Sequence, residues 1–62
     1  MKAFNVGDMV KIILMDNGDT DYFSIGDIGM VVEESDYIPF ISFDHGVYCA
    51  CDYQLLIIER AQ

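Results

Sequence analysis

Short runs of apolar residues alternate along this chain with turns rich in glycine and aspartate. The runs contain many Ile, Val, Phe and Tyr residues, which fit the pleated surface of a sheet, and no helical periodicity connects them. The pattern predicts five β-strands, which we place at residues 9–15, 30–34, 38–43, 47–51 and 56–59.

The connections between these runs carry the residues that particular turns require. Gly7-Asp8 and Gly26-Asp27 precede the first two strands, and Asp27 is expected to accept hydrogen bonds from amides of its own turn. Residues 44–46 predict a tight hairpin. Residues 52–55 predict a 3-10 turn before the last strand. Because Pro39 has no amide proton, we expect it at the start of its strand or at a sheet edge.

The remaining features concern the core and the first long connection. Residues 16–21 are polar and predict an exposed loop, while the later half of the first strand is apolar on both faces and indicates a central or seam position. Phe23 and Phe43 are the expected core aromatics. Gly26 and Gly29 are expected where the chain turns sharply and passes close to a neighbour.

Several short motifs resemble those of known small barrels. Val6-Gly7-Asp8-Met9-Val10 and Gly26-Asp27-Ile28-Gly29-Met30 are similar to the paired Gly-Asp signatures of KOW and Mind bomb-type SH3-like repeats. Phe43-Asp44-His45-Gly46 resembles the hairpin of the Mind bomb-type repeats, and Leu55-Leu56-Ile57 resembles their closing strand. The resemblance implies an all-β, five-stranded SH3-like barrel with a 3-10 turn before the last strand. Residues 1–62 would form it as a single domain.

The other small closed barrel, the OB fold, fits the connections less well. It usually carries a helix between its third and fourth strands, where this chain has only residues 44–46. No targeting segment follows Met1-Lys2, and the longest apolar runs are far too short to span a bilayer. We therefore expect a cytosolic protein.

The net charge of −8 limits the partners that this chain would attract. KOW modules that bind RNA are basic around the first loop, whereas this loop holds Asp16, Asp19 and Asp21. The charge argues against nucleic acid and anionic membranes, and favours a basic protein surface. An alternative interpretation is that the charge only keeps a small chain with 53% hydrophobic residues soluble. Proline-rich ligands are not expected, because their groove normally needs a tryptophan and the chain has none.

No residue pattern points to catalysis or to a bound metal or cofactor. In the EF-hand spacing that begins at Asn17, Tyr22 replaces the required glycine and Ile28 the required glutamate. Cys49 and Cys51 lack the spacing of a zinc site and are expected to be free thiols. His45 is most simply a turn residue, so we expect a binding protein with no catalytic residues, no metal and no cofactor.

The function that these observations favour is a small acidic module that binds protein. An inhibitor or adaptor of the kind that phages and mobile elements encode would dock on a basic surface of a larger protein that handles nucleic acid. The alternatives are an assembly module that forms homo-oligomers or joins a larger complex, and nucleic-acid binding of the KOW type. Tyrosines beside carboxylates suit a protein contact, although each tyrosine could instead cover the edge of a thin core. The expected contact residues are Asp16, Asp19, Asp21, Tyr22, Glu33, Glu34, Asp36, Tyr37 and Tyr53.

Overall fold

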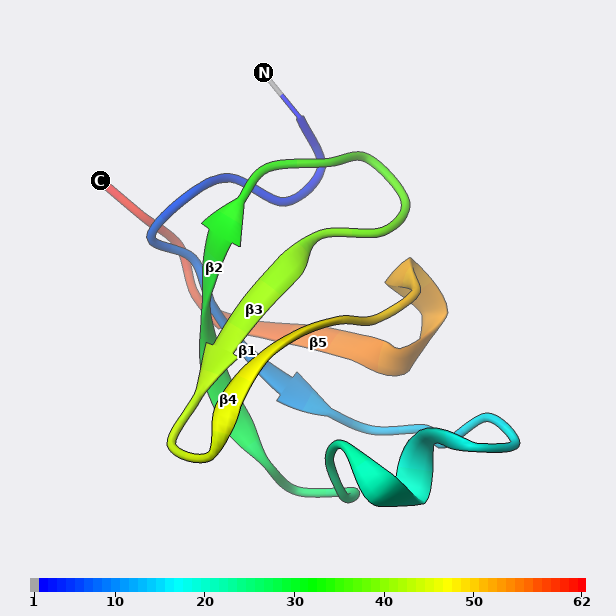
Figure 1. Cartoon of the computed structure of the whole chain (residues 1–62). Coiled ribbons are helices and arrows are strands. Elements are labelled where there is room, and N and C mark those ends of the chain that lie inside the picture. The colour runs from blue at the N-terminus through cyan, green and yellow to red at the C-terminus, as the bar shows by residue number, and fades with distance from the viewer. Residues whose placement is uncertain (1) are drawn as a thin grey trace.

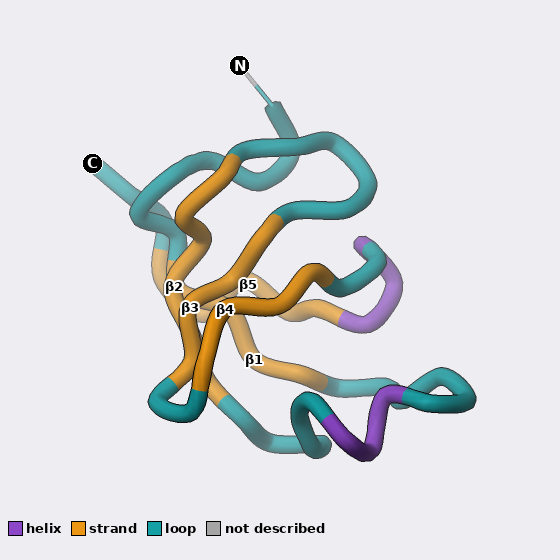
Figure 2. The backbone as a smooth tube through the Cα atoms, viewed as in Figure 1, coloured by secondary structure: helices purple, strands orange, loops and turns teal. Residues whose placement is uncertain are grey.

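The chain folds as an all-β structure of five antiparallel strands (Figure 1). The computed structural model describes residues 2–62. The strands are β1 (Met9–Ile12), β2 (Ile28–Glu33), β3 (Phe40–Phe43), β4 (Gly46–Cys49) and β5 (Leu55–Glu59). Two 3-10 turns, η1 (Asp19–Asp21) and η2 (Asp52–Gln54), lie in the connections, as Figure 2 shows. Within this part of the chain no helix has the length and apolar character needed to cross a membrane.

The strands form one sheet in the order β4-β3-β2-β1-β5. This order is consistent with an SH3-like barrel and confirms the predicted 3-10 turn before the last strand. The sheet is not closed, because β4 and β5 are its two ends and pair only with β3 and β1. The segment between them is taken up by η2, so the barrel expected from the sequence is open on this side (Figure 2).

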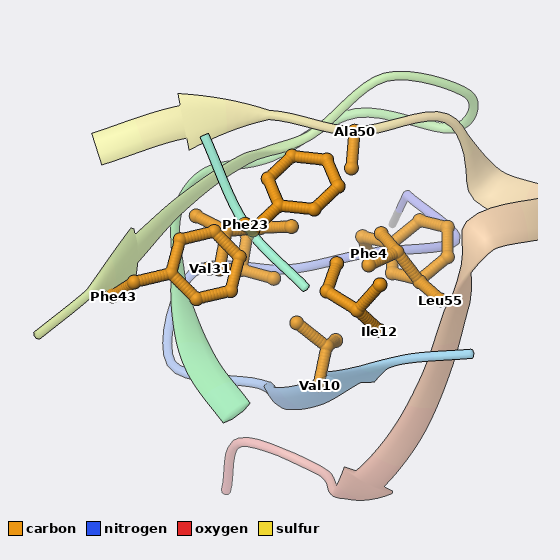
Figure 3. Packing of buried hydrophobic residues seen from close by; sticks show 9 residues of the cluster. Phe4, Val10, Ile12, Phe23, Val31, Phe43, Ala50 and Leu55 are labelled. Atoms are coloured by element: carbon orange, nitrogen blue, oxygen red, sulfur yellow. The ribbon is translucent and has the colours of Figure 1, made fainter. Parts of the chain in front are cut away.

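One face of the sheet covers a small apolar core (Figure 3). Alternate residues of the strands point into it, and Val10, Ile12, Val31 and Ile41 are fully buried. The two aromatic rings expected in the core, those of Phe23 and Phe43, stack with their centroids 5.6 Å apart. The full core consists of Phe4, Val10, Ile12, Phe23, Val31, Ile41, Phe43, Ala50 and Leu55.

The first strand is an inner strand, paired with β2 and β5, but it ends at Ile12 rather than at residue 15. The backbone of Ile12 still bonds to the Gly26 and Asp27 turn, at 2.8 and 2.9 Å. The next amide, that of Ile13, donates instead to the carbonyl of Gln54 at 2.8 Å. The chain therefore leaves the sheet at this point and follows η2.

Most ends of the other four strands lie one or two residues away from their predicted positions. Strand β2 begins at Ile28, and β3 begins at Phe40, immediately after Pro39. Pro39 therefore precedes its strand, as its missing amide requires. The hairpin prediction is confirmed, because Phe43 and Gly46 pair across the two residues between them.

Three turns of the chain are closed by the same reciprocal pair of hydrogen bonds. In each, the aspartate amide donates to the carbonyl three residues earlier, and its carboxylate accepts from that residue's amide. A glycine with φ between 90 and 97° precedes the aspartate each time, in the left-handed region that favours glycine. The turns are Asn5–Asp8, Asp16–Asp19 and Ser24–Asp27.

Asp8 also ties the C-terminal segment to the start of β1. Its carboxylate is buried and accepts from the amides of Ala61 (2.7 Å) and Asn5 (3.0 Å). Burial by itself raises the pKa of this carboxyl, but the two amides and the Arg60 guanidinium, 4.0 Å away, outweigh burial and hold the pKa below its ordinary value. Both chain ends lie on this side of the molecule (Figure 1).

Gly29 is the one buried glycine of β2 and allows the sheet to curve over the core. A Cβ at this position would lie 2.6 Å from Cγ2 of Ile41 and 2.7 Å from the carbonyl oxygen of Ser42. The second of these is backbone of the paired strand, which cannot move aside without breaking the ladder. This confirms the expected close approach at Gly29 and explains why no larger residue fits there.

We predict that Asp8→Asn lowers the free energy of unfolding by about 1–3 kcal/mol near neutral pH, the cost of losing charge-assisted bonds at a buried site. Because the folded pKa of Asp8 is depressed, its stabilising effect is complete above the unfolded value of about 3.9. The effect is lost as the pH falls through the folded pKa. Urea unfolding of both proteins from about pH 7 to pH 2 measures the difference.

The asparagine variant is its own control, because the protonated carboxyl of Asp8 and the amide of asparagine have nearly the same shape. The stability curves of the two proteins should therefore converge at the acid end. A difference that stays constant over the whole range would contradict the assigned role of the Asp8 charge.

Candidate protein-binding surface

The long loop between β1 and β2 is locked onto η2 by one buried side chain. Gln54 is 2% exposed, and its Nε2 donates to Oδ2 of Asp19 (2.6 Å) and to the carbonyl of Leu14 (3.2 Å). Its Oε1 accepts from the amide of Cys51 (2.8 Å), which closes η2 as the aspartates close their turns. The same Asp19 oxygen accepts from the amide of Asp16 (3.0 Å). The loop expected to be simply exposed is thus attached to the body of the domain.

Asp16 and Tyr53 form a second link between the same two segments. The Tyr53 hydroxyl donates to Oδ2 of Asp16. This bond to a carboxylate is the main reason that the pKa of the Tyr53 phenol lies above its ordinary value, and the nearby Cys51 adds to it. Tyr53 nevertheless exposes half of its surface. It is therefore a positioned aromatic ring at the surface, held in place from the acidic loop.

An aromatic group lies where the long loop meets the β3–β4 hairpin. The rings of Tyr22 and Tyr48 are 5.2 Å apart, and His45 stacks on Phe43 at 5.5 Å. The Nε2 of His45 lies 2.5 Å from the carbonyl oxygen of Tyr22, so this nitrogen carries the proton. His45 is an exposed turn residue, as expected, and it also fastens the end of η1 to the hairpin.

A pocket of about 390 Å³ opens between η1 and β4. It is lined by three aromatic rings, one carboxylate and two further side chains of β4: Phe40, Tyr22, Tyr48, Asp19, Val47 and Cys49. Asp19 and Tyr22 were expected contact residues, and the pocket brings them together. Tyr48 and Phe40 were not expected, because the strand pattern gives no sign of what lies beside an edge strand.

The remaining expected contact residues lie around the β2–β3 connection. Glu33 and Glu34 are exposed at the end of β2, and the carboxylate of Asp36 accepts from the amide of Ala3 at 2.8 Å, with Lys2 4.0 Å away. Tyr37 is 71% exposed, and its carbonyl accepts from the amide of Asp52, the first residue of η2. Figure 1 shows this connection and the long loop on opposite sides of η2. The expected contact residues therefore lie in two separate acidic groups rather than on one continuous surface.

Few carboxylates of either acidic group have a neighbouring cation, and in the second group Glu33 and Glu34 form no salt bridge within residues 2–62. The salt bridges within residues 2–62 join Lys2 to Asp36 and Arg60 to Asp8, both near the chain ends. The carboxylates of Asp16, Asp19, Asp21 and Asp52 have no such partner in the part of the chain that the structure describes. The negative charge around η1 and η2 is therefore uncompensated.

The outer face of the sheet carries a set of exposed apolar side chains that the sequence analysis did not single out. Their strands are paired so that these residues lie in rows across the same face. One row runs from Met30 through Ser42 to Val47. Another runs from Ile28 through Lys11 to Leu56. We call this set the outer apolar face: Ile28, Met30, Val32, Phe40, Val47, Leu56 and Ile58. Along β2 the exposed Ile28, Met30 and Val32 alternate with the buried Gly29 and Val31, but both sets lack polar residues, so the sequence does not show which face is outward.

The cysteines and the histidine do not form a metal site in the described residues. Cys49 and Cys51 are free thiols, the first exposed and the second half-buried. Across residues 2–62 no three His, Cys, Asp or Glu side chains are grouped to hold an ion.

Comparison with known proteins gives no family model, no curated protein and no solved structure that matches this chain.

We predict that Gln54→Met, which keeps the size of the side chain and removes its amide, destabilises the protein by about 2 kcal/mol, since it leaves buried polar groups without partners. The loss should concentrate in the long loop, because Asp19 and the Leu14 carbonyl lose their links to η2. Amide hydrogen exchange at Tyr22 and Phe23, whose amides donate to the Asp19 carbonyl, reports this local opening.

Tyr53→Phe is the matched control, because it removes one exposed hydrogen bond from the same turn and should cost less than about 0.5 kcal/mol. Equal exchange rates at Tyr22 and Phe23 in Gln54→Met and in the unaltered protein would show that the loop does not depend on Gln54.

Proposed function

We propose that this chain is a small acidic module, similar to the KOW and Mind bomb-type SH3-like repeats, that binds a basic surface of another protein. The observation that carries the proposal is the uncompensated negative charge beside three exposed tyrosines. Tyr22, Tyr37 and Tyr53 are 49%, 71% and 54% exposed. Tyrosine is enriched at the centres of protein interfaces, where its ring buries apolar area and its hydroxyl finds a partner.

Electrostatics supports a basic partner over an acidic one. The chain carries a net charge of −8, and its paired cations lie away from η1 and η2. A partner with lysines and arginines would be attracted to this side of the molecule, while nucleic acid and anionic lipid would be repelled. The module acts by occupying a surface and performs no chemistry. An inhibitor or adaptor of a protein that handles nucleic acid fits this description.

We expect the immobilised chain to capture a basic protein from the cytosol of its source cell at about 0.05 M salt and to release it at about 0.5 M, where screening is nearly complete. Asp21→Lys should weaken the affinity of the purified pair by about tenfold, because an attractive contact becomes repulsive. The captured protein is identified by mass spectrometry, and its affinity is measured by calorimetry.

The matched control is Glu59→Lys, which makes the same change in net charge, from −8 to −6, at the far end of β5. It should change the affinity less than Asp21→Lys does. Capture that survives high salt, or equal weakening by both variants, would contradict the proposal.

The outer apolar face favours a second candidate function, assembly with a second copy of the chain. It spreads over all the strands except β1, and its members are at least 40% exposed. Exposed apolar surface of this kind usually marks an interface. Two copies related by a two-fold axis would bury the same face on each.

If the chain assembles in this way, sedimentation should show a dimer at about 10 μM that Met30→Lys dissociates, because the substitution places a charge in the centre of a buried interface. Ile25→Lys is the control, since Ile25 is exposed in a turn outside the outer apolar face. A monomer at all concentrations would rule out this second function and leave the first unaffected.

A further inference from the structure

Strand β4 is an edge strand, so the backbone amides and carbonyls on its outer side pair with no other strand of the sheet. The Ala50 amide donates to the Pro39 carbonyl at 3.3 Å, and the Asp52 amide to the Tyr37 carbonyl at 2.7 Å. In an antiparallel ladder, residues alternate between bonding toward the neighbour and bonding away from it. Tyr48 therefore bonds toward β3, while the amides and carbonyls of Val47 and Cys49 point to the open edge.

The pocket beside η1 lies along this edge. Val47 and Cys49 line it from β4, and Asp19 and Tyr22 line it from the long loop. With a volume of about 390 Å³, it has room for a long side chain. The groove is formed by fixed parts, since His45 holds Tyr22 to the hairpin and Gln54 holds Asp19 to η2.

The lining of the groove favours a cationic side chain. Aromatic faces attract ammonium and guanidinium groups that lie within about 6 Å of the ring centre. Tyr22, Tyr48 and Phe40 supply such faces, and Asp19 supplies a carboxylate. Its Oδ2 is used by Asp16 and Gln54, while its Oδ1 accepts no hydrogen bond from residues 2–62. A cation in the groove would thus meet one carboxylate oxygen that the fold leaves open.

We propose that the groove between β4 and η1 binds an extended segment of a partner protein as an added strand, with one lysine or arginine side chain held among Tyr22, Tyr48 and Asp19. The inference rests on the proposed function, because it names the part of the basic partner that this surface takes. Backbone bonds to Val47 and Cys49 supply the affinity, and the cationic side chain supplies the specificity.

A second copy of this chain is a poor occupant of the same groove. Pairing β4 with β4 of another copy would place the Asp19 carboxylates of both copies beside the shared edge. Like charges brought into contact at an interface are unfavourable and are one way in which proteins exclude wrong partners. The groove therefore suits a basic segment, whereas the outer apolar face is the part suited to self-association.

The test uses the full chain labelled with nitrogen-15 and a peptide of about nine alternating threonine and valine residues, a length that covers the edge, with one central arginine. We expect titration to shift the amide signals of Val47, Cys49 and Tyr22, and to slow hydrogen exchange at Val47 and Cys49. The same peptide with norleucine or glutamate in place of arginine should bind at least about tenfold more weakly, because it lacks the cation.

Cys49→Pro removes an outward amide without removing a bond to β3, so it should abolish binding of the peptide and leave exchange at Tyr48 and Ala50 unchanged. Cys49→Thr keeps the amide and should bind as the unaltered chain does. Equal binding of the arginine and norleucine peptides would overturn the proposal for the cation, and this comparison needs no variant. Shifts confined to residues outside the groove would overturn the proposal for the site.

The failure of this inference can be told apart from failure of the proposed function. If Cys49→Pro still captures the basic protein at low salt, the groove is not its site, and the salt-dependent binding function stands. If capture is insensitive to salt and to Asp21→Lys, the proposed function fails, whatever the peptide titration shows.

Discussion

The contact between Gln54 and Asp19 is the interaction on which the candidate surface depends. A buried amide side chain costs about 1–3 kcal/mol when it lacks partners, so Gln54 is stable only with the long loop folded against η2. This contact fixes the position of Asp19 and the start of the turn at Asp16 relative to η2. The other end of the loop is held separately, by the bond between His45 and Tyr22 and by the burial of Phe23. Without Gln54, the pocket would lose the fixed position of Asp19 on its wall.

Several of the acidic side chains that give the chain its net charge also have structural roles. The carboxylates of Asp8, Asp19 and Asp27 each close a turn, and those of Asp8 and Asp19 also join distant segments. Three of the eleven acidic residues therefore stabilise the fold through hydrogen bonds of their carboxylates. The exposed carboxylates around η1 and η2 without a salt bridge are the ones that would attract a partner under the proposed function.

The sequence predicts the fold better than it predicts the surface. Alternating apolar residues, Gly-Asp turns and Pro39 are local signals, so the number of strands, the hairpin and η2 are confirmed. The end of β1 at Ile12 and the burial of Asp8 and Gln54 depend on contacts with residues far away in the chain, and no local pattern encodes them. The same is true of the pocket, where Asp19 and Tyr22 meet Phe40, Tyr48 and β4 only through the folded loop.

An open sheet with an apolar outer face needs protection from unwanted pairing. Edge strands add further strands readily, and natural proteins shorten them or place charges beside them. Strand β4 has four residues and β5 ends in Glu59, and the Asp19 carboxylate lies near the open side of β4. A carboxylate beside the edge disfavours pairing of β4 with β4 of an identical copy. In the added-strand proposal the same carboxylate attracts a basic segment, so one feature would both discourage self-pairing at β4 and select the partner.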